Sequence, residues 1–446
     1  MSRVTLLTAL LGFGSAAHAQ DTVLVHQRTL NGTVLMTGNT LGRSGATANV
    51  WDTNPPLTQL TDAPGKFHSA FTWINDRTPV TQENAAWGGY TTGDWRQNFS
   101  YARLSYPGAG TGKLLKAWLV WSGSCVQNDG AVTEDISAHI GDPITFTYPT
   151  ASGSGSLFVS PDFSEEHCGE PFGDGYVNWA ELTIGQDWTE GMYGAGGIPG
   201  TQNRTREGFA GWTLITVIED PLTYPDPHQV SIYRGWVRPA YAETDPPTHV
   251  SDFCYPSDDG EEGRLLLTAV EGDARIRDDY LLFGNSTTWA SKNIMWGRRN
   301  AIDNFFGSQI VDRDGDYIDG GVHFTPVDHH PWTSFDCWME DYDTTPDDAI
   351  NVDCLKDGAR QGWDIANIPI NDTFGEECSY VDEDVMVTDA PCNPDIFQSG
   401  DTEAWFLPMT AGDEYRVLAV ALDLPSVSAS VTTLVEPLAD PSVYVN

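Results

Sequence analysis

The sequence predicts an all-β protein made of two β-sandwich, jelly-roll-like halves with long loops, stapled by disulfides. Three observations predict this fold. Glycine and proline contribute 44 and 27 of the 446 residues and are scattered along the chain, so the backbone reverses direction often. Between these reversals lie short runs rich in β-branched and aromatic residues, which are typical of strands. Six of the seven cysteines are expected to pair in disulfides, because the sequence predicts an exported chain.

Export is predicted by residues 1–19, which have the pattern of a secretory signal peptide. Arg3 precedes an apolar run, and the small residues Ala17 and Ala19 mark a cleavage site before Gln20. The run is too short to span a bilayer, and no later stretch has the roughly 20 uninterrupted apolar residues of a membrane helix. We therefore expect a secreted protein without a membrane span, located in the periplasm, outside the cell or at the cell surface.

The roughly 427 residues after the signal peptide exceed the usual size of one hydrophobic core. A polar, proline-bearing stretch near the middle of the chain separates two series of strand-like runs. We expect an N-terminal sandwich over residues 20–240, a C-terminal sandwich with an acidic loop insert over 241–434, and a tail over 435–446.

The expected strands follow one another along the chain. "NGTVLMTGNTL" (31–41) and "LLKAWLVWSGS" (114–124) contain apolar runs that end at Gly, Asn or Ser. "GWTLITVIEDP" (211–221) and "HQVSIYRGW" (228–236) predict a hairpin with a loop of medium length. The later strands are expected in "GRLLLTAVEGD" (263–273), "DDYLLFGN" (278–285) and "EYRVLAVALDL" (414–424).

The net charge excludes one class of partner. The chain has 63 acidic and 23 basic residues, for a formal charge of −40. Such a surface repels nucleic-acid phosphates and anionic lipids, so we expect neither as a partner. Two explanations of the acids are compatible with each other: a solvated acidic coat and the binding of several divalent cations.

"VDRDGDYIDG" (311–320) predicts a calcium-binding loop. Calcium takes about six to eight oxygen ligands at flexible spacing, which acids on alternate residues around a glycine turn can supply. The expected ligands are Asp312, Asp314, Asp316, the backbone carbonyl of Ile318, and Asp319. The loop is similar to the acidic loops of integrin-type and dockerin-type repeats. It is not an EF-hand, because Tyr317 stands at the place of the central glycine and the final glutamate is missing. The alternative is an empty, solvated acidic turn.

The expected disulfides involve six of the seven cysteines, which leaves one as a buried free thiol or as a link to another chain. The candidates are Cys125, Cys168, Cys337, Cys354, Cys378 and Cys392. The clustering of the last four suggests local bridges from Cys337 to Cys354 and from Cys378 to Cys392. The connectivity is otherwise open.

Two further groups have a functional and a structural interpretation. The first group consists of Asp328, His329, His330 and Asp336. Its imidazole and carboxylate side chains are suitable ligands for a transition metal. Adjacent histidines in a strand point to opposite faces, so a polar loop is the favoured interpretation. Trp212 and Trp363 would form a sugar-stacking platform if they were exposed, but core positions are favoured for both.

The order of the phrases "NGTVLMTGNTL", "FAGWTLITVIEDP", "TAVEGDARIRDDYLLFGN", "GWDIANIPI" and "EYRVLAVALDL" resembles a bacterial secreted β-sandwich family. That family typically occupies the amino-terminal part of cell-surface and adhesin-like proteins. The resemblance covers about residues 30–425. Many of the relatives are domains of unknown function, so the resemblance implies a fold and a location more than an activity.

Common catalytic signatures are missing from the sequence, including His-Glu-x-x-His, Gly-x-Ser-x-Gly, the phosphate loop and the dinucleotide glycine pattern. We therefore expect a non-catalytic structural or adhesive protein, stabilised by calcium, whose partners are other surface proteins or glycans. The alternatives are a carbohydrate-binding module and a secreted hydrolase that uses a carboxylate pair or a metal near residues 328–336.

Overall fold

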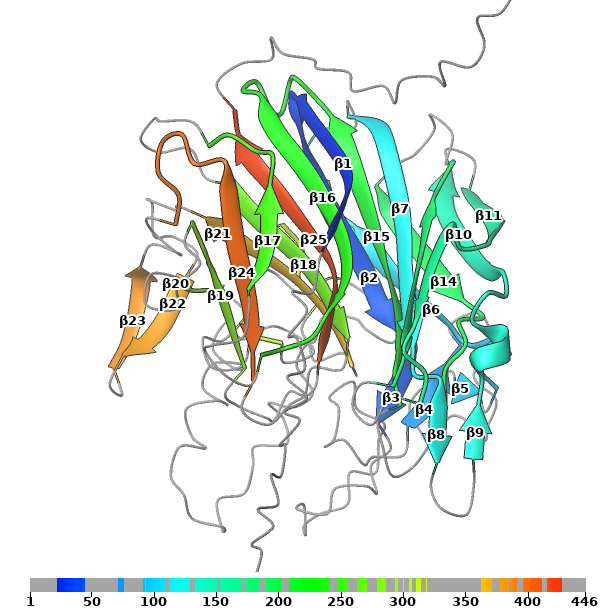
Figure 1. The fold of residues 1–446 in the computed structure, drawn as a ribbon. Helices are drawn as coiled ribbons and strands as arrows, with labels where there is room; N and C mark the ends of the chain where they lie inside the picture. Colours follow the sequence, from blue (N-terminus) through cyan, green and yellow to red (C-terminus); the bar gives the residue numbers. More distant parts are fainter. Residues whose placement is uncertain are drawn as a thin grey trace, which may run out of the picture.

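The computed structural model shows four antiparallel sheets stacked in layers (Figure 1). The structure describes residues 22–44, 71–75, 91–92, 94–106, 108, 112–128, 133–150, 153–169, 174–183, 190–201, 208–240, 247–255, 263–270, 279–285, 293–295, 300, 305–306, 310–313, 318, 362–370, 378–382, 385–390, 396–410 and 415–426.

The sheets are numbered here in the order of the stack. Sheet 1 consists of β11 (Gly153–Val159), β10 (Ile144–Thr150), β14 (Gly191–Gly196) and β6 (Phe99–Leu104). Sheet 2 consists of β12 (Phe163–Glu166), β13 (Tyr176–Glu181), β7 (Lys113–Gly123), β15 (Ala210–Glu219) and β2 (Gly32–Thr40). Sheet 3 consists of β1 (Val23–Leu30), β16 (His228–Val237), β25 (Arg416–Pro425), β18 (Gly263–Val270) and β21 (Trp363–Ile370). Sheet 4 consists of β17 (Thr248–Ser251), β24 (Glu403–Met409), β19 (Tyr280–Gly284) and β20 (Asn293–Ile294).

Smaller elements lie outside the four large sheets. Three short ladders are formed by β3 (Gly42–Ser44), β4 (Phe71–Ile74) and β5 (Thr91–Thr92), by β8 (Val126–Asn128) and β9 (Thr133–Asp135), and by β22 (Cys378–Asp382) and β23 (Val385–Ala390). Two 3-10 turns span Trp95–Gln97 and Ser137–His139. The part of the chain that the structure describes contains no α-helix.

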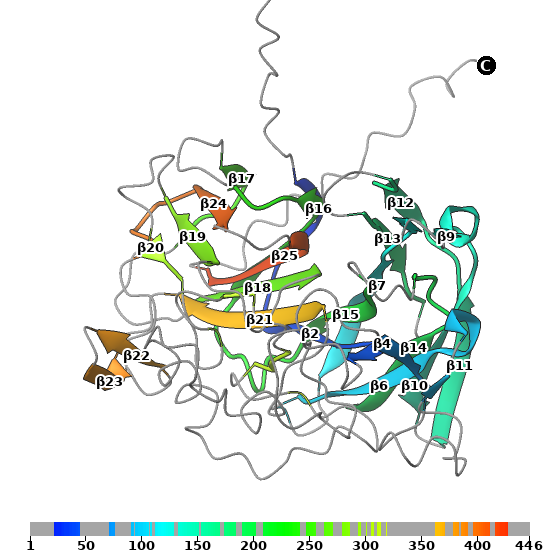
Figure 2. The ribbon, with the colours of Figure 1, turned by 90° about the horizontal axis from the view of Figure 1, so that it is seen from below.

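Two large hydrophobic cores hold the stack together, beside a small cluster of Ala240, Leu282 and Leu407. One core extends through sheets 1, 2 and 3, and the other fills the space between sheets 3 and 4. The layers appear in this order in both views (Figures 1 and 2). Sheets 2 and 3 are therefore the inner layers, and both faces of their central strands are buried, which explains their nearly continuous apolar sequences.

Strand β15 shows how the side chains of an inner sheet pack against the sheets on both sides of it. The ring of Trp212 meets Phe146 of sheet 1, and its Nε1 donates to Ser100 Oγ there at 3.0 Å. The next residue, Thr213, points the other way and accepts a hydrogen bond from Trp363 Nε1 of sheet 3 at 3.0 Å. Alternation along a strand thus distributes side chains to both layers. Gly211 is required here, because a Cβ at that position would come within 2.3 Å of the Trp363 ring.

The prediction of a hairpin over residues 211–236 is wrong. Strand β15 pairs with β2 and β7 in sheet 2, whereas β16 pairs with β1 and β25 in sheet 3. Both edges of β15 are already occupied, so the chain passes to the next layer instead of folding back beside it. The connecting turn is shaped by Asp220, whose Oδ1 accepts the backbone N–H groups of Leu222 and Thr223.

The all-β sandwich class is confirmed, and the runs predicted as strands are strands. Sheet 3 contains strands from both sides of the expected boundary at residue 240. Its strands β1 and β16 precede that residue, and β25, β18 and β21 follow it. The division into domains at that residue stays a prediction. The signal peptide at 1–19 and the tail at 435–446 lie outside the described residues.

Candidate metal loop and its buried anchor

The structure places the start of the predicted calcium loop against β21 of sheet 3 and brings Ile318 back to Ile310. The backbone N–H of Val311 donates to the Ile365 carbonyl of β21 at 3.0 Å, and the N–H of Ile318 donates to the Ile310 carbonyl at 3.0 Å. Ile310 and Ile318 are both buried in the core between the layers. Of the five expected ligands, Asp312 and Ile318 are described, and Asp314, Asp316 and Asp319 lie outside the described residues.

Arg313, inside the loop sequence, turns inward. One of its guanidinium nitrogens, Nη1, donates to Thr33 Oγ1 at 2.9 Å and to the Tyr224 hydroxyl at 2.6 Å. The guanidinium also lies 4.8 Å from the centre of the Tyr224 ring, a cation–π contact. The carbonyl of Arg313 accepts a hydrogen bond from Nη1 of Arg264 on β18. Arg313 thereby fastens the loop to strands of sheets 2 and 3.

A buried carboxylate, Asp423 of β25, forms the centre of this anchor. Its Oδ1 lies 2.8 Å from Nδ1 of His228 on β16, and its Oδ2 accepts the Thr33 hydroxyl at 2.5 Å. Burial alone would raise the pKa of Asp423. The charge and hydrogen bond of His228, the Arg313 guanidinium and the Thr33 hydroxyl outweigh burial and hold this pKa below its ordinary value. Asp423 is therefore an anion inside the protein, and it joins β2, β16 and β25.

A second buried acid supports Tyr224. The Asp220 carbonyl accepts the Tyr224 N–H at 2.9 Å, while its Oδ2 accepts the hydroxyls of Tyr106 at 2.5 Å and Thr223 at 2.8 Å. Burial, followed by the hydrogen bond to Asp220, raises the pKa of Tyr106 well above its usual range. Tyr106 therefore stays a neutral donor, and the turn that carries Tyr224 is fixed.

The geometry of this cluster is structural rather than nucleophilic. In an acid–base–nucleophile triad the imidazole lies between the carboxylate and the hydroxyl. Here the Asp423 carboxylate lies between the His228 imidazole and the Thr33 hydroxyl, so the hydroxyl donates to the acid and not to the base. The arrangement holds strands together and does not activate Thr33 as a nucleophile.

The only basic residue of the loop sequence belongs to the anchor. The sequence from 311 to 320 contains four aspartates and one basic residue, Arg313. The Arg313 guanidinium is directed into the Asp423 cluster, where it helps to lower the pKa of Asp423. Carboxylates and a backbone carbonyl are the ligands that calcium prefers. The residue types at 312–319 are of this kind, and calcium binding by them stays a prediction.

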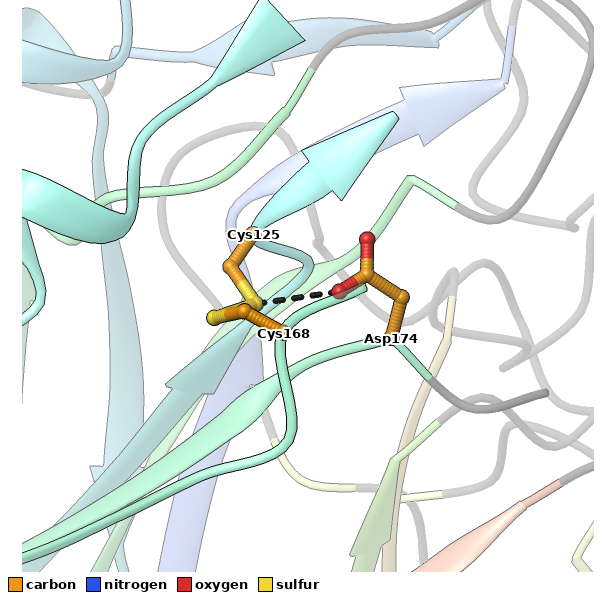
Figure 3. Close-up of side chains that lie close together, drawn as sticks. All are labelled: Cys125, Cys168 and Asp174. Atoms are coloured by element: carbon orange, nitrogen blue, oxygen red, sulfur yellow. Dashed lines mark hydrogen bonds between the residues drawn. A yellow bond between two sulfur atoms is a disulfide. The ribbon is translucent and has the colours of Figure 1, made fainter. Parts of the chain in front are cut away.

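Cys125 and Cys168 form a disulfide, 43 residues apart, which confirms two of the six disulfide candidates as a pair. Asp174 lies against it (Figure 3), with its Oδ1 3.1 Å from Cys125 Sγ. The Asp174 carboxylate accepts the backbone N–H groups of Gly169 at 2.8 Å and Val126 at 2.7 Å. Burial raises the pKa of Asp174 all the same. With the sulfurs bonded to each other, this trio offers no thiolate to a metal.

The other predicted cysteines are not placed by the structure. Cys337, Cys354 and Cys392 lie outside the described residues, and Cys378 is described only as the first backbone position of β22. Cys254 is exposed and bonds to no other cysteine in the described ranges. The local bridges among the last four cysteines stay predictions.

The remaining sequence candidates have clear outcomes where they are described. Trp212 and Trp363 are fully buried, as favoured, so neither forms a sugar-stacking platform. The group of Asp328, His329, His330 and Asp336 lies outside the described residues. Sequence reasoning missed Asp423 and Arg264, although a single charge within an apolar strand such as "VLAVALDL" or "GRLLLTAV" signals a buried partner.

No family model, no curated protein and no solved structure matches this chain. Among the residues described by the structure, no helix has the length and apolarity to cross a membrane.

Proposed function

We propose that this protein is a secreted or cell-surface structural and adhesive component, stabilised by calcium bound at 312–319, and not an enzyme. The anchoring of Arg313 to Thr33 and Tyr224 carries the proposal, since it fixes the acidic loop sequence to the core. The Thr33 hydroxyl lies near both Asp423 and His228, but it is not arranged as a nucleophile because it donates to the acid.

Three further observations support an extracellular site of action. The first 19 residues have the pattern of a signal peptide. The disulfide between Cys125 and Cys168 suits an oxidising compartment. The charge of −40 suits a solvated protein surface in the presence of divalent cations. Other surface proteins or glycans are the proposed partners, as in the bacterial family that the sequence resembles.

Calcium should raise the midpoint of thermal unfolding, because an ion that binds only the folded state stabilises it by mass action. The test compares the midpoint with excess calcium and with chelator. The rise should be largely lost in the double variant Asp314→Ala, Asp316→Ala. The matched control is Glu166→Ala, Glu190→Ala, which removes two exposed acids elsewhere on the surface and should keep the full rise. A wild-type midpoint that calcium does not move would contradict the proposal.

A further inference from the structure

Strand β11 is an edge of sheet 1 that lacks the devices which normally protect an edge. Unprotected edges pair with other chains, so natural edges carry charges, prolines, bulges or very short strands. The sequence of β11, GSGSLFV, has none of these, and neither β11 nor its neighbour β10 contains a charged residue. The two strands pair over seven residues without an irregularity. In the described part of the chain, β10 is the only strand that pairs with β11 (Figure 1).

The other edges of the four large sheets are protected. β12 carries Glu165 and Glu166, β6 carries Arg103, and β1 carries Arg28 and an irregular register. β17 and β20 have four and two residues, and β2 and β21 are buried over their whole length. The absence of protection is therefore specific to β11 among these edges.

β11 also presents the most exposed large apolar side chain of the described residues. Phe158 is 84% exposed, and Ser154 and Ser156 on the same face are exposed too. On the opposite face, Leu157 is only partly buried, and the ring of Tyr148 covers Gly155 so closely that a Cβ there would lie 2.4 Å from it. An added strand would cover apolar surface on both faces.

We propose that β11 pairs antiparallel with β11 of a second copy of the chain, about a two-fold axis at Ser156. The strand is self-complementary in size, since its first three residues are small and its last three are large. Pairing about Ser156 sets Phe158 opposite Ser154 of the partner subunit and Leu157 opposite Gly155 of the partner subunit, beside Tyr148. Each large side chain faces a small one, and the two copies of sheet 1 become one continuous sheet.

Charge supports a second copy at this edge. Two chains of charge −40 repel each other, and they approach with the least repulsion where neither surface carries charge. Salt screens the remaining repulsion, with a Debye length of about 8 Å at physiological ionic strength. Dimerisation should therefore strengthen as salt is added, whereas added salt would weaken the binding of a basic partner.

Sedimentation equilibrium of the full chain tests the proposal. A single strand pair is a small interface, so we expect a dimer with a dissociation constant that is micromolar or weaker, of order 1–100 µM. Phe158→Lys should weaken the dimer at least about tenfold by placing a charge on the edge. Leu222→Lys is the control, because Leu222 is also exposed, at 80%, but lies on the turn after β15. A wild-type chain that stays monomeric at high salt, or a Phe158→Lys dimer as strong as wild type, would overturn the proposal.

Cross-linking tests the register separately. In a Cys254→Ser background, Ser156→Cys places two sulfurs across the axis, where Cα atoms of an antiparallel pair lie about 4.5–5.5 Å apart and within disulfide reach. The control Ser154→Cys places its two copies about 14 Å apart along the strands. We expect Ser156→Cys to form the covalent dimer at least about tenfold faster. Equal rates, or no covalent dimer from Ser156→Cys, would reject this pairing.

Discussion

Two buried carboxylates in this protein have opposite electrostatics. Burial works against the charge of both Asp423 and Asp174, yet the pKa of Asp423 lies below its ordinary value and that of Asp174 lies above it. Asp423 has His228 and Arg313 beside it. Asp174 contacts two backbone N–H groups and the sulfur of Cys125, and the nearby Asp135 raises its pKa further. A neighbouring cation, rather than hydrogen bonding alone, decides which buried acid keeps its charge.

The two sites also hold the chain together in different ways. Asp423 connects β2, β16 and β25 without any covalent bond, so this connection depends on the charge of the carboxylate. Beside Asp174 the chain is closed covalently by the disulfide of Cys125 and Cys168. The region of Asp174 can therefore tolerate an acid whose charge is destabilised by burial. The region of Asp423 requires an acid whose charge is stabilised by its neighbours.

The largest effect is expected from Asp423→Asn. The variant leaves Arg313 and His228 without their anion, which costs about 3–5 kcal/mol in the free energy of unfolding near neutral pH. Because the pKa of Asp423 is lowered on folding, its stabilisation is present above the ordinary value of 3.8 and is lost as the pH falls through the folded-state pKa. Urea unfolding at several pH values should show the difference from wild type shrinking in acid. The exposed Asp226→Asn is the control, and an Asp423→Asn variant as stable as that control would refute this account.

Removing the disulfide should have the next largest effect. Its two cysteines are 43 residues apart, and closing a loop of that length restricts the unfolded chain by about 4 kcal/mol. The double variant Cys125→Ser, Cys168→Ser should lose stability of this order in the same urea experiment. Cys254→Ser, which breaks no bond to a described cysteine, should leave the midpoint unchanged. Equal midpoints for the double variant and wild type would show that the covalent closure is unimportant.

The smallest effect is expected from Asp174→Asn, and its pH dependence should have the opposite sign. A carboxyl group whose pKa is raised on folding destabilises the fold increasingly as the pH rises above its unfolded value of 3.8. As the pH rises, the free energy of unfolding of Asp174→Asn should therefore increase relative to wild type. That of Asp423→Asn should decrease relative to wild type. If the stability of both variants relative to wild type changed with pH in the same direction, the distinction between the two acids would be wrong.

The sequence is sufficient to predict the long inner strands of sheets 2 and 3, because a strand buried on both faces needs an apolar run such as those of β7, β15 and β25. It does not specify the neighbours of a strand. The runs at 211–221 and 228–236 suit a hairpin by proximity alone, and only the occupied edges of β15 exclude it. For the same reason the lone charge in "VLAVALDL" signals that Asp423 has a buried partner but not that the partner is His228, 195 residues away. The spacing of the acids predicts a calcium loop at 311–320, which stays a prediction, and it does not indicate the inward direction of Arg313.

The most direct test of calcium binding at 312–319 is an isothermal calcium titration of the protein and of the variant Asp314→Asn, Asp316→Asn. The account predicts a specific site in wild type, with a dissociation constant of order 0.1–1 mM or tighter as in extracellular calcium modules, that is missing from the variant. Identical titrations of the two chains, or no specific binding to wild type, would contradict it.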